Sequence, residues 1–240
     1  MDWAMPHFDV YRQDMVNYYD HASQLAYAFN AGELARQYDE VYANEGSWMR
    51  DLAQAIQGIS RGRRVLEIAC GHGRWTRYIA DSARYVMATD ASQRMLDQAR
   101  QVVHWGRTLP DWRCEFRKLD AFHVDQVPGE FGAAVAVNFF QHIPRARQDA
   151  FLDALHRKLG SGAEVLIAIN RLKRSTRARF YRKPGEPDLF DLRQLKDGSV
   201  YEIVDNVFTP GQLGAIFAGR CESYRFHAGA KFDWITYTVT

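Results

Sequence analysis

Short apolar runs alternate along the chain with helical segments, and this alternation predicts the order of strands and helices. Continuous apolar runs that predict buried strands occupy residues 63–70, 84–90, 114–120, 133–140 and 163–170. Segments that predict helices lie among them at residues 74–83, 92–103 and 145–159. Apolar strands separated by helices are typical of an α/β fold with a doubly wound, mostly parallel sheet, covered on both faces.

Further elements flank this core on both sides. Residues 14–46 are aromatic-rich and helical in pattern, and an amphipathic helix is predicted over residues 47–62, with Ser47 as its N-cap. After Asn170, residues 191–219 predict two strands and a short helix, and residues 223–240 predict two final antiparallel strands. We predict an N-terminal helical lid region over 1–62 and a core over 63–240 that contains a basic insertion at 171–196.

Composition narrows the class of protein. The chain has 240 residues, of which 47% are hydrophobic and 13% aromatic, so a globular domain with a full core is expected. Lys and Arg number 31 against 29 Asp and Glu, which gives no overall case for nucleic-acid binding. Three widely spaced cysteines show no disulfide framework. The first residues lack a signal-peptide pattern, and no apolar run approaches the ~18 residues of a membrane span, so we predict a cytoplasmic protein.

The loop after the first core strand combines glycines with a carboxylate. Gly71 and Gly73 allow the backbone to turn sharply and approach a ligand at the start of a helix. A dinucleotide-binding loop would place a third glycine where Thr76 stands. Glu67, four residues before Gly71, would repel a pyrophosphate and would suit a ligand that carries a positive charge.

The stretch VLEIACGHGRWT, residues 65–76, resembles the glycine-rich motif of class I S-adenosylmethionine-dependent methyltransferases. The resemblance implies a Rossmann-like fold with a seven-stranded sheet and S-adenosyl-L-methionine as the cofactor. It implies that Glu67 contacts the methionine part of the cofactor and that the backbone at Gly71 and Gly73 lies against it. Ala69 stands where the family often has a first glycine.

The ends of the following strands agree with this resemblance. Asp90 follows the second strand, where a carboxylate can accept hydrogen bonds from ribose hydroxyls. By resemblance Asp120 accepts from the adenine amino group. The resemblance thus implies a set of cofactor-binding residues consisting of Tyr38, Glu67, Ala69, Gly71, Gly73, Asp90, Ala91, Met95, Asp120, Ala121 and Asn138.

The likeness extends over roughly residues 34–217, to small bacterial methyltransferases that act on low-molecular-weight acids and metabolites. In that group an arginine often precedes the tyrosine–aspartate pair, whereas this chain has Leu34. Tyr38 is therefore the first candidate for binding the cofactor's carboxylate, and Tyr18 or Tyr19 is the second.

His142 follows the fourth strand and is the candidate general base. A carboxylate or phosphonate acceptor is already ionised and needs no base, whereas a phenol, an alcohol or a ring N–H benefits from one by roughly 10²–10⁴-fold. The alternative is a structural histidine that orients the loop before Pro144. Cys70 and His72 suggest a metal only superficially, because no second ligand pair has suitable spacing, and no metal is predicted.

Several residues are candidates for binding the acceptor. The basic stretch 171–183 holds seven Lys or Arg, and it is either a substrate lid or a solvated loop. The N-terminal aromatic residues either form a lid with a stacking surface or belong to a helix core. The candidate substrate-binding residues are Tyr18, Tyr19, Phe139, Phe140, Arg177, Arg179 and Arg193.

The predicted function is S-adenosylmethionine-dependent methyl transfer to a small molecule in secondary metabolism. The favoured reaction is O-methylation of an acidic or aromatic metabolite. N-methylation of a heterocycle is the alternative. Modification of nucleic acid or protein is disfavoured because residues 138–141, NFFQ, lack a proline pair and the chain lacks a basic excess. A binding module without activity and a nicotinamide oxidoreductase are the remaining alternatives, and the oligomeric state is left open.

Overall fold

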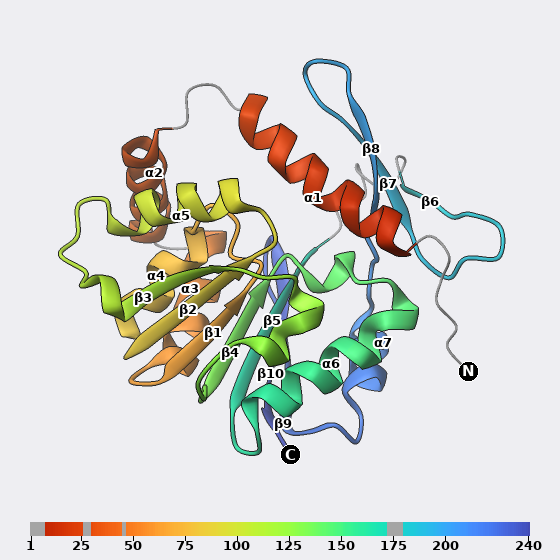
Figure 1. The fold of residues 1–240 in the computed structure, drawn as a ribbon. Coiled ribbons are helices and arrows are strands. Elements are labelled where there is room, and N and C mark those ends of the chain that lie inside the picture. Colours follow the sequence, from red (N-terminus) through yellow and green to blue (C-terminus); the bar gives the residue numbers. More distant parts are fainter. Residues whose placement is uncertain (1–7, 26–29, 45–46, 172–179) are drawn as a thin grey trace.

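The computed structural model describes residues 8–25, 30–44, 47–171 and 180–240, and its centre is a seven-stranded mixed sheet (Figure 1). The strand order is β3-β2-β1-β4-β5-β10-β9, with β1 to β5 parallel and β10 antiparallel to both of its neighbours. The strands are β1 (Arg64–Ile68), β2 (Tyr85–Asp90), β3 (Cys114–Lys118), β4 (Ala133–Val137), β5 (Glu164–Asn170), β9 (Cys221–Ala228) and β10 (Phe232–Val239). The predicted Rossmann-like, mostly parallel sheet is confirmed.

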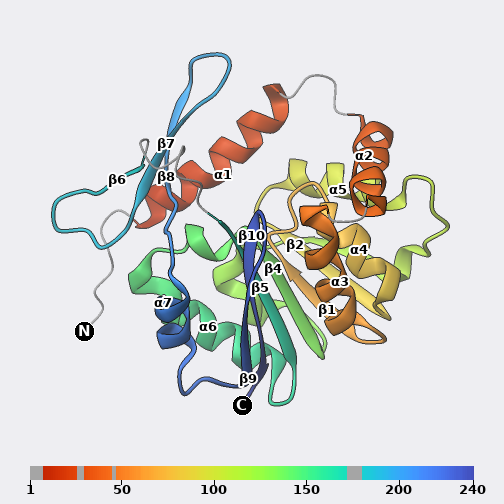
Figure 2. The ribbon, with the colours of Figure 1, turned by 180° about the vertical axis from the view of Figure 1, so that it is seen from behind.

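Helices cover both faces of this sheet, as the continuous apolar strands require. One face packs against α3 (Trp48–Ser60), α4 (Arg74–Ser82) and α5 (Gln93–His104), and the other against α6 (Arg145–Leu159) and α7 (Pro210–Phe217) (Figures 1 and 2). Short 3-10 turns lie between α5 and β3 at η1 (Asp111–Arg113), between β3 and β4 at η2 (Ala121–Gln126), and between β4 and α6 at η3 (Phe140–His142). Within β1, Val65 and Glu67 face the α3–α5 side, and Leu66 and Ile68 face the α6–α7 side.

The predicted lid region contains two different kinds of helix. α3 contributes Leu52 and Ile56 to the core under the main sheet, and α2 (Ala31–Ala43) packs against α3 and α5. Only α1 (Phe8–Leu25) lies apart from these layers, across the carboxyl ends of the parallel strands (Figure 1). The structure therefore limits the covering element to α1, because the apolar stripe of α3 is buried in the core.

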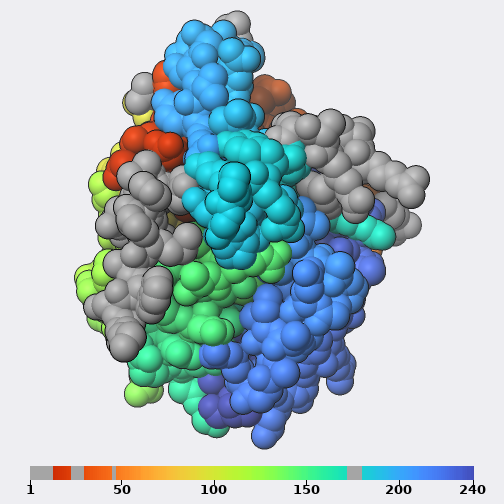
Figure 3. Space-filling view, turned by 90° about the vertical axis from the view of Figure 1, so that its right-hand side faces the viewer, coloured from red at the N-terminus to blue at the C-terminus, as the bar shows by residue number. Residues whose placement is uncertain are grey.

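A second sheet begins within the predicted basic insertion, residues 171–196, and extends beyond it. Its order is β6-β7-β8, all antiparallel, from β6 (Phe180–Tyr181), β7 (Phe190–Gln194) and β8 (Val200–Val204), with Gly198 at φ +91° in the turn. Figures 1 and 3 show this sheet beside α1, and α1 contacts β8. His21 lies between the Tyr201 hydroxyl, 2.7 Å from its Nδ1, and the Asp197 carboxylate, 2.9 Å from its Nε2. This second sheet thus supports α1.

Two glycines in left-handed conformations allow a comparison of backbone strain with steric clash. Gly73 has φ +82°, and an added Cβ would lie 3.0 Å from both Cα and Cβ of Ala99 on α5. Gly62 has φ +70° and no atom within 4 Å of an added Cβ. A side chain at Gly73 would therefore add overpacking to the cost of the left-handed backbone.

We expect Gly73→Ala to lower the free energy of unfolding by about 2–4 kcal/mol, the sum of backbone strain and overpacking. Gly62→Ala is the matched control and should cost only about 1–2 kcal/mol, from strain alone. Urea denaturation of both variants measures the difference. Equal losses would show that contact with α5 is not what requires glycine at position 73.

Candidate active site

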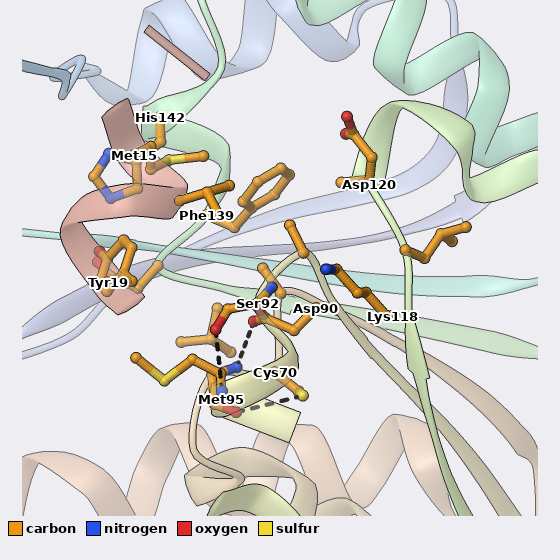
Figure 4. Close-up of a pocket in the computed structure, with 18 of the residues that line it drawn as sticks. Met15, Tyr19, Cys70, Asp90, Ser92, Met95, Lys118, Asp120, Phe139 and His142 are labelled. Atoms are coloured by element: carbon orange, nitrogen blue, oxygen red, sulfur yellow. Dashed lines mark hydrogen bonds between the residues drawn. The ribbon is translucent and has the colours of Figure 1, made fainter. Parts of the chain in front are cut away.

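A cavity of about 730 Å³ lies beneath α1 at the carboxyl ends of β1, β2, β3 and β4. Figure 4 shows Asp90, Ser92, Cys70 and Met95 on one side of this cavity and Asp120 and Lys118 on another. Its wall includes predicted cofactor-binding residues from four separate segments: Ala69, Gly71, Asp90, Ala91, Met95, Asp120, Ala121 and Asn138. Parallel strands bring these segments together because their carboxyl ends share one edge of the sheet.

Asp90 fixes the glycine loop in place. Its Oδ2 accepts a hydrogen bond from the Gly71 backbone N–H at 2.9 Å, and its Oδ1 accepts one from the Ser92 N–H at 2.9 Å. Burial raises the pKa of the Asp90 carboxyl, and these N–H donors act against that rise. Each carboxylate oxygen can accept a further hydrogen bond, so Asp90 can hold the loop and still bind a ligand hydroxyl.

The loop requires positive φ at three closely spaced residues, Ala69 (+53°), Gly71 (+55°) and Gly73 (+82°). An added Cβ at Gly71 would meet no atom within 4 Å, since this residue lies on the cavity wall. Gly73 lies outside the wall and supports it from behind, at the start of α4. Ala69 also adopts the left-handed conformation, although its Cβ makes this conformation costlier than it is for glycine.

Glu67 lies behind the loop and not on the cavity wall formed by the described residues. Its side chain is buried, and Oε2 has no hydrogen-bond partner among the residues that the structure places. Burial raises its pKa to about 8 from an ordinary value near 4.5, and the charge of Asp90 adds to the rise. The contact expected between Glu67 and the cofactor, directly or through water, stays a prediction.

Arg74 is a cavity residue that the sequence reasoning missed. Its guanidinium lies 4.6 Å from the ring centre of Tyr38, and Nε has no hydrogen-bond partner in the described part of the chain. A signal was available in the sequence, because an arginine at the first position of a helix opposes the helix dipole and needs another reason to be there. Arg74 presents a cation where an anionic ligand group can bind.

Tyr38 supports this part of the cavity without lining it. Its side chain is 2% exposed, and its hydroxyl lies 3.1 Å from His72 Nδ1, with the two rings stacked. His72 is on the wall, and burial together with Arg74 lowers its pKa to about 4, so it is neutral at pH 7. Tyr38 therefore lies behind the cavity wall, next to the two wall residues His72 and Arg74.

His142 reaches the cavity from the turn η3 with one nitrogen already bonded. Its Nδ1 lies 2.7 Å from the carbonyl oxygen of Val204, so Nδ1 carries the proton and donates it. Nε2 then has a free lone pair and no partner among the described residues. Burial lowers the pKa of His142, and the neutral imidazole is the form present at pH 7. His142 thus has the tautomer and charge state of a general base that accepts a proton at Nε2.

Aromatic and apolar side chains surround His142. Figure 4 groups Met15 and Tyr19 from α1 with Phe139 and His142 on one side of the cavity. The Tyr19 ring lies 6.5 Å from the His142 ring in a T-shaped arrangement. Asn138 sits at φ +61° with its side-chain oxygen accepting from Gln141. This end of the cavity can hold a flat apolar molecule.

Two aromatic residues predicted to bind substrate lie elsewhere. Phe140 is fully buried and packs against Phe151, Phe208 and Phe217, because the turn η3 directs it to the α6–α7 side. Tyr18 lies on the side of α1 that faces the second sheet, with Arg193 5.1 Å from its ring centre. Neither residue is on the cavity wall that the described residues form.

Arg193 is held by two carboxylates and not by the cavity. Its Nε donates to Asp191 at 3.0 Å and its Nη2 donates to Asp205 at 2.8 Å. The cation is thus paired within the protein, and Arg193 is not on the cavity wall that the described residues form. Arg177 and Arg179 lie outside the described residues.

Metal binding and membrane insertion are two further possibilities for the residues that the structure describes. Among these residues no group of three or more His, Cys, Asp or Glu is placed to hold a metal ion. The described helices likewise include none that is long and apolar enough to cross a membrane.

The comparisons with known proteins agree with the strand order and the loop geometry. Residues 65–162 match a family model described as a methyltransferase domain. The methyltransferase GfsG of Streptomyces halstedii is 26% identical over 168 residues, which cover 67% of this chain and 59% of that protein. This chain therefore matches less than two thirds of that relative's length.

Two solved structures share the fold over nearly the whole chain. A DhpI–SAM–HEP complex has a TM-score of 0.65 at 24% identity and covers 95% of this chain and 97% of its own. The 1,6-didemethyltoxoflavin N1-methyltransferase of Burkholderia thailandensis has a TM-score of 0.55 at 18% identity and covers 100% and 92%. Residues 65–162 thus match a methyltransferase domain, and the strand order and the glycine loop agree with the predicted resemblance to class I S-adenosylmethionine-dependent methyltransferases.

The raised pKa of Glu67 predicts how stability depends on pH. A carboxyl whose pKa is higher in the folded state favours folding below its unfolded pKa, and this contribution is lost as pH rises through about 8. Glu67→Gln has no carboxyl to ionise at this position and should not lose this stability as pH rises. We therefore expect the free energy of unfolding of the variant, minus that of the wild type, to rise by roughly 2–4 kcal/mol between pH 5 and pH 8.5. Urea unfolding at both pH values measures it.

Glu33→Gln is the control for loss of a carboxylate, because Glu33 is exposed on α2. Its stability relative to the wild type should stay nearly constant over the same pH range. A flat difference for Glu67→Gln as well would show that Glu67 is ionised in the folded protein at pH 5.

Proposed function

We propose that the protein transfers a methyl group from S-adenosylmethionine to a hydroxyl group of a small aromatic acceptor, in secondary metabolism. The observation that carries this proposal is His142, a residue of the cavity wall whose Nδ1–H is fixed on the Val204 carbonyl while its buried Nε2 has no partner among the described residues. A base so placed is useful only if the acceptor loses a proton.

The remainder of the cavity fits the cofactor's functional groups. Asp90 has capacity to accept from ribose hydroxyls, and Asp120 lies across the cavity on the side expected for adenine (Figure 4). Gly71 leaves open space where a side chain would otherwise project. Arg74, with its unpartnered Nε, would bind the carboxylate of the methionine part. When bound, S-adenosylmethionine supplies an electrophilic methyl group on a positively charged sulfur.

The chain's own contribution is to orient the acceptor, exclude water and take up a proton. Phe139 and Met15 offer apolar surfaces for a flat ring, and α1 closes the cavity above them. Holding the reacting groups in line in this way can lower the free-energy barrier of the reaction by ~7–11 kcal/mol. The acceptor hydroxyl gives its proton to His142 Nε2 as its oxygen becomes the nucleophile.

The structure favours an aromatic acceptor over an acidic one. Met15, Tyr19, Phe139 and His142 form the acceptor end, and none of these four is a cation at pH 7. Arg193, which was expected to pair with an acid, is bonded to Asp191 and Asp205. An ionised acceptor would also have no use for the base. These points support a neutral phenol-like hydroxyl.

N-methylation of a heterocycle is the second candidate. A ring N–H can give its proton to His142 Nε2 as a hydroxyl does, and the same apolar surfaces suit a flat heterocycle. The N1-methyltransferase whose structure covers 100% of this chain shows that the fold serves such chemistry. A screen with matched phenol and heterocycle acceptors distinguishes the two.

The first experiment is an acceptor screen that follows S-adenosylhomocysteine formation with catechols, phenols, heterocycles and carboxylic acids. With the best acceptor, we expect His142→Gln to lower kcat by roughly 10²–10³-fold and to leave the Kd for S-adenosylhomocysteine unchanged. The acidic limb of the wild-type pH profile should lie below the ordinary histidine range, because burial lowers the pKa of His142.

His104→Gln is the matched control, because His104 ends α5 outside the cavity. Its kcat should equal that of the wild type. Full activity of His142→Gln would overturn the role of His142 as a base. Turnover of carboxylic acids alone would overturn the phenolic acceptor class.

The anchor of the cofactor carboxylate has a separate test. Arg74→Met should weaken S-adenosylhomocysteine binding by roughly 10–100-fold, since a charge-assisted hydrogen bond to a carboxylate is lost. Its affinity for 5′-methylthioadenosine, which lacks the amino-acid part, should stay within about twofold of the wild type. Calorimetric titration measures both, and equal weakening for the two ligands would contradict the assignment of Arg74.

A further inference from the structure

We propose that Asn138 directs its side-chain NH₂ group at the methyl acceptor and thereby selects phenols that carry a second oxygen atom. This inference rests on the proposed function, because it names the class of phenol that the same cavity takes. Asn138 would donate to the second oxygen while His142 takes the proton of the hydroxyl that is methylated. Gln141 is the positioning residue that fixes the amide of Asn138.

The turn that carries Asn138 and His142 is held in place by backbone hydrogen bonds to distant parts of the chain. The Asn138 N–H donates to the Ala168 carbonyl on β5 at 2.7 Å, and the Gln141 carbonyl accepts from the Asn206 N–H at 2.8 Å. Asn138 and His142 are both on the cavity wall. The two side chains therefore start from fixed backbone positions on one turn of that wall.

The backbone of Asn138 is left-handed, with φ at +61°. Residues other than glycine adopt this conformation rarely, although asparagine does so more readily than most. The conformation costs free energy, and residues held in it cluster at functional sites. Glycine would satisfy the backbone without this cost. A side chain at this position therefore points to a use for its amide.

Gln141 determines which end of the Asn138 amide is free. Gln141 Nε2 donates to Asn138 Oδ1, whereas Asn138 Nδ2 makes no hydrogen bond to the residues that the structure describes. The Gln141 side chain is 1% exposed, and its Oε1 has no partner within the described ranges. Turning both amides over would instead leave a buried NH₂ group unpaired, and orphaned donors are rarer in proteins than orphaned carbonyls. This orientation is thus the less costly one, and it leaves the Asn138 NH₂ group available to a ligand.

Asn138 and His142 offer opposite hydrogen-bonding roles to a bound molecule. The Asn138 NH₂ group can only donate, whereas His142 Nε2 can only accept in the tautomer that Val204 fixes. A hydroxyl matches His142, and an ether, carbonyl or second hydroxyl oxygen matches Asn138. Met15 and Phe139 offer apolar surfaces for the ring that joins the two oxygens (Figure 4). A phenol with a single oxygen would leave the amide donor unpaired.

The cofactor is the partner that the sequence resemblance implies for Asn138. The polar groups of the cofactor already have proposed partners in Asp90, Asp120 and Arg74, which lie on other segments of the wall. Asn138 belongs instead to the turn that leads into His142, the proposed base. The methyl acceptor is therefore the ligand for which this donor is available.

The test compares acceptors that differ in one oxygen. Each of the three methoxyphenol isomers is paired with the ethylphenol isomer of the same substitution pattern, because an ethyl group has nearly the size of a methoxy group and no oxygen. In the presence of S-adenosylhomocysteine, we expect one methoxyphenol to bind the wild-type protein roughly tenfold more tightly than its ethyl partner in calorimetric titration. Ratios of one or below for all three pairs would overturn the proposal.

Asn138→Asp keeps the side-chain shape and tolerates left-handed backbone, but it replaces the donor with an oxygen. The affinity ratio of the best methoxyphenol to its ethyl partner should fall roughly tenfold. The Kd for S-adenosylhomocysteine should stay within about twofold of the wild type. Weaker S-adenosylhomocysteine binding with an unchanged ratio would assign the amide to the cofactor and overturn the proposal.

Gln141→Leu releases the amide of Asn138 without removing it, and it decides the matter if Asn138→Asp does not fold. The affinity ratio should fall roughly threefold, since the freed amide no longer holds one orientation. An unchanged ratio would overturn the positioning role of Gln141.

Gln148→Leu is the matched control. Gln148 is also a buried glutamine that supports this turn, because its Nε2 donates to the Ile143 carbonyl at 3.2 Å, but it is not on the cavity wall that the described residues form. This variant should lose stability and keep the affinity ratio of the wild type. A fall equal to that of Gln141→Leu would show that the turn as a whole sets the selectivity, and it would overturn the role of Gln141.

Binding separates this proposal from the proposed function, because affinity does not require a base. If His142→Gln keeps full activity, the role of His142 as a base fails, while the wild-type affinity ratios still decide the role of Asn138. If ethylphenols bind and react as well as methoxyphenols, the phenolic acceptor class stands and selection by Asn138 is overturned. If no phenol binds, both proposals fail.

Discussion

The geometry of this protein depends on the sharp turn between β1 and α4. That turn requires left-handed backbone at residues 69, 71 and 73, and it is held by the bond from the Gly71 N–H to Asp90 at the end of the neighbouring strand. With the turn in place, the start of α4, the end of β2 and the Arg74 side chain converge on one cavity. A change in the turn would therefore move groups on α4 and β2 together.

The two ends of the cavity are built by different parts of the chain. The main sheet supplies the side with Asp90 and Asp120, and its strands β1, β2 and β4 are buried there on both faces. The other side combines η3 with α1, and α1 in turn rests on the second sheet through His21 and Tyr19. The first side is a fixed consequence of the sheet, whereas the second can vary without disturbing it.

The sequence predicted the first side well because its signals are local. A buried strand, a glycine turn and a carboxylate at a strand end are readable within a few residues, and Asp90, Asp120 and Gly71 all lie where they were expected. The second side depends on contacts between residues more than a hundred positions apart, such as Tyr19 with Arg193. No local pattern distinguishes Phe139, which faces the cavity, from Phe140, which faces the core. Arg74 was overlooked although its conflict with the helix dipole was visible.

Helix α1 is tied to both sides of the cavity it covers. On one side Ser92, at the start of α5, donates to Asp20, and on the other His21 contacts Tyr201 and Asp197. Any opening wide enough to release a bound molecule through this cover must break contacts on at least one of the two sides. The residence time of either ligand is thus partly a property of α1, so affinity and exchange rate can evolve separately: the first through the cavity wall, and the second through residues that no ligand touches.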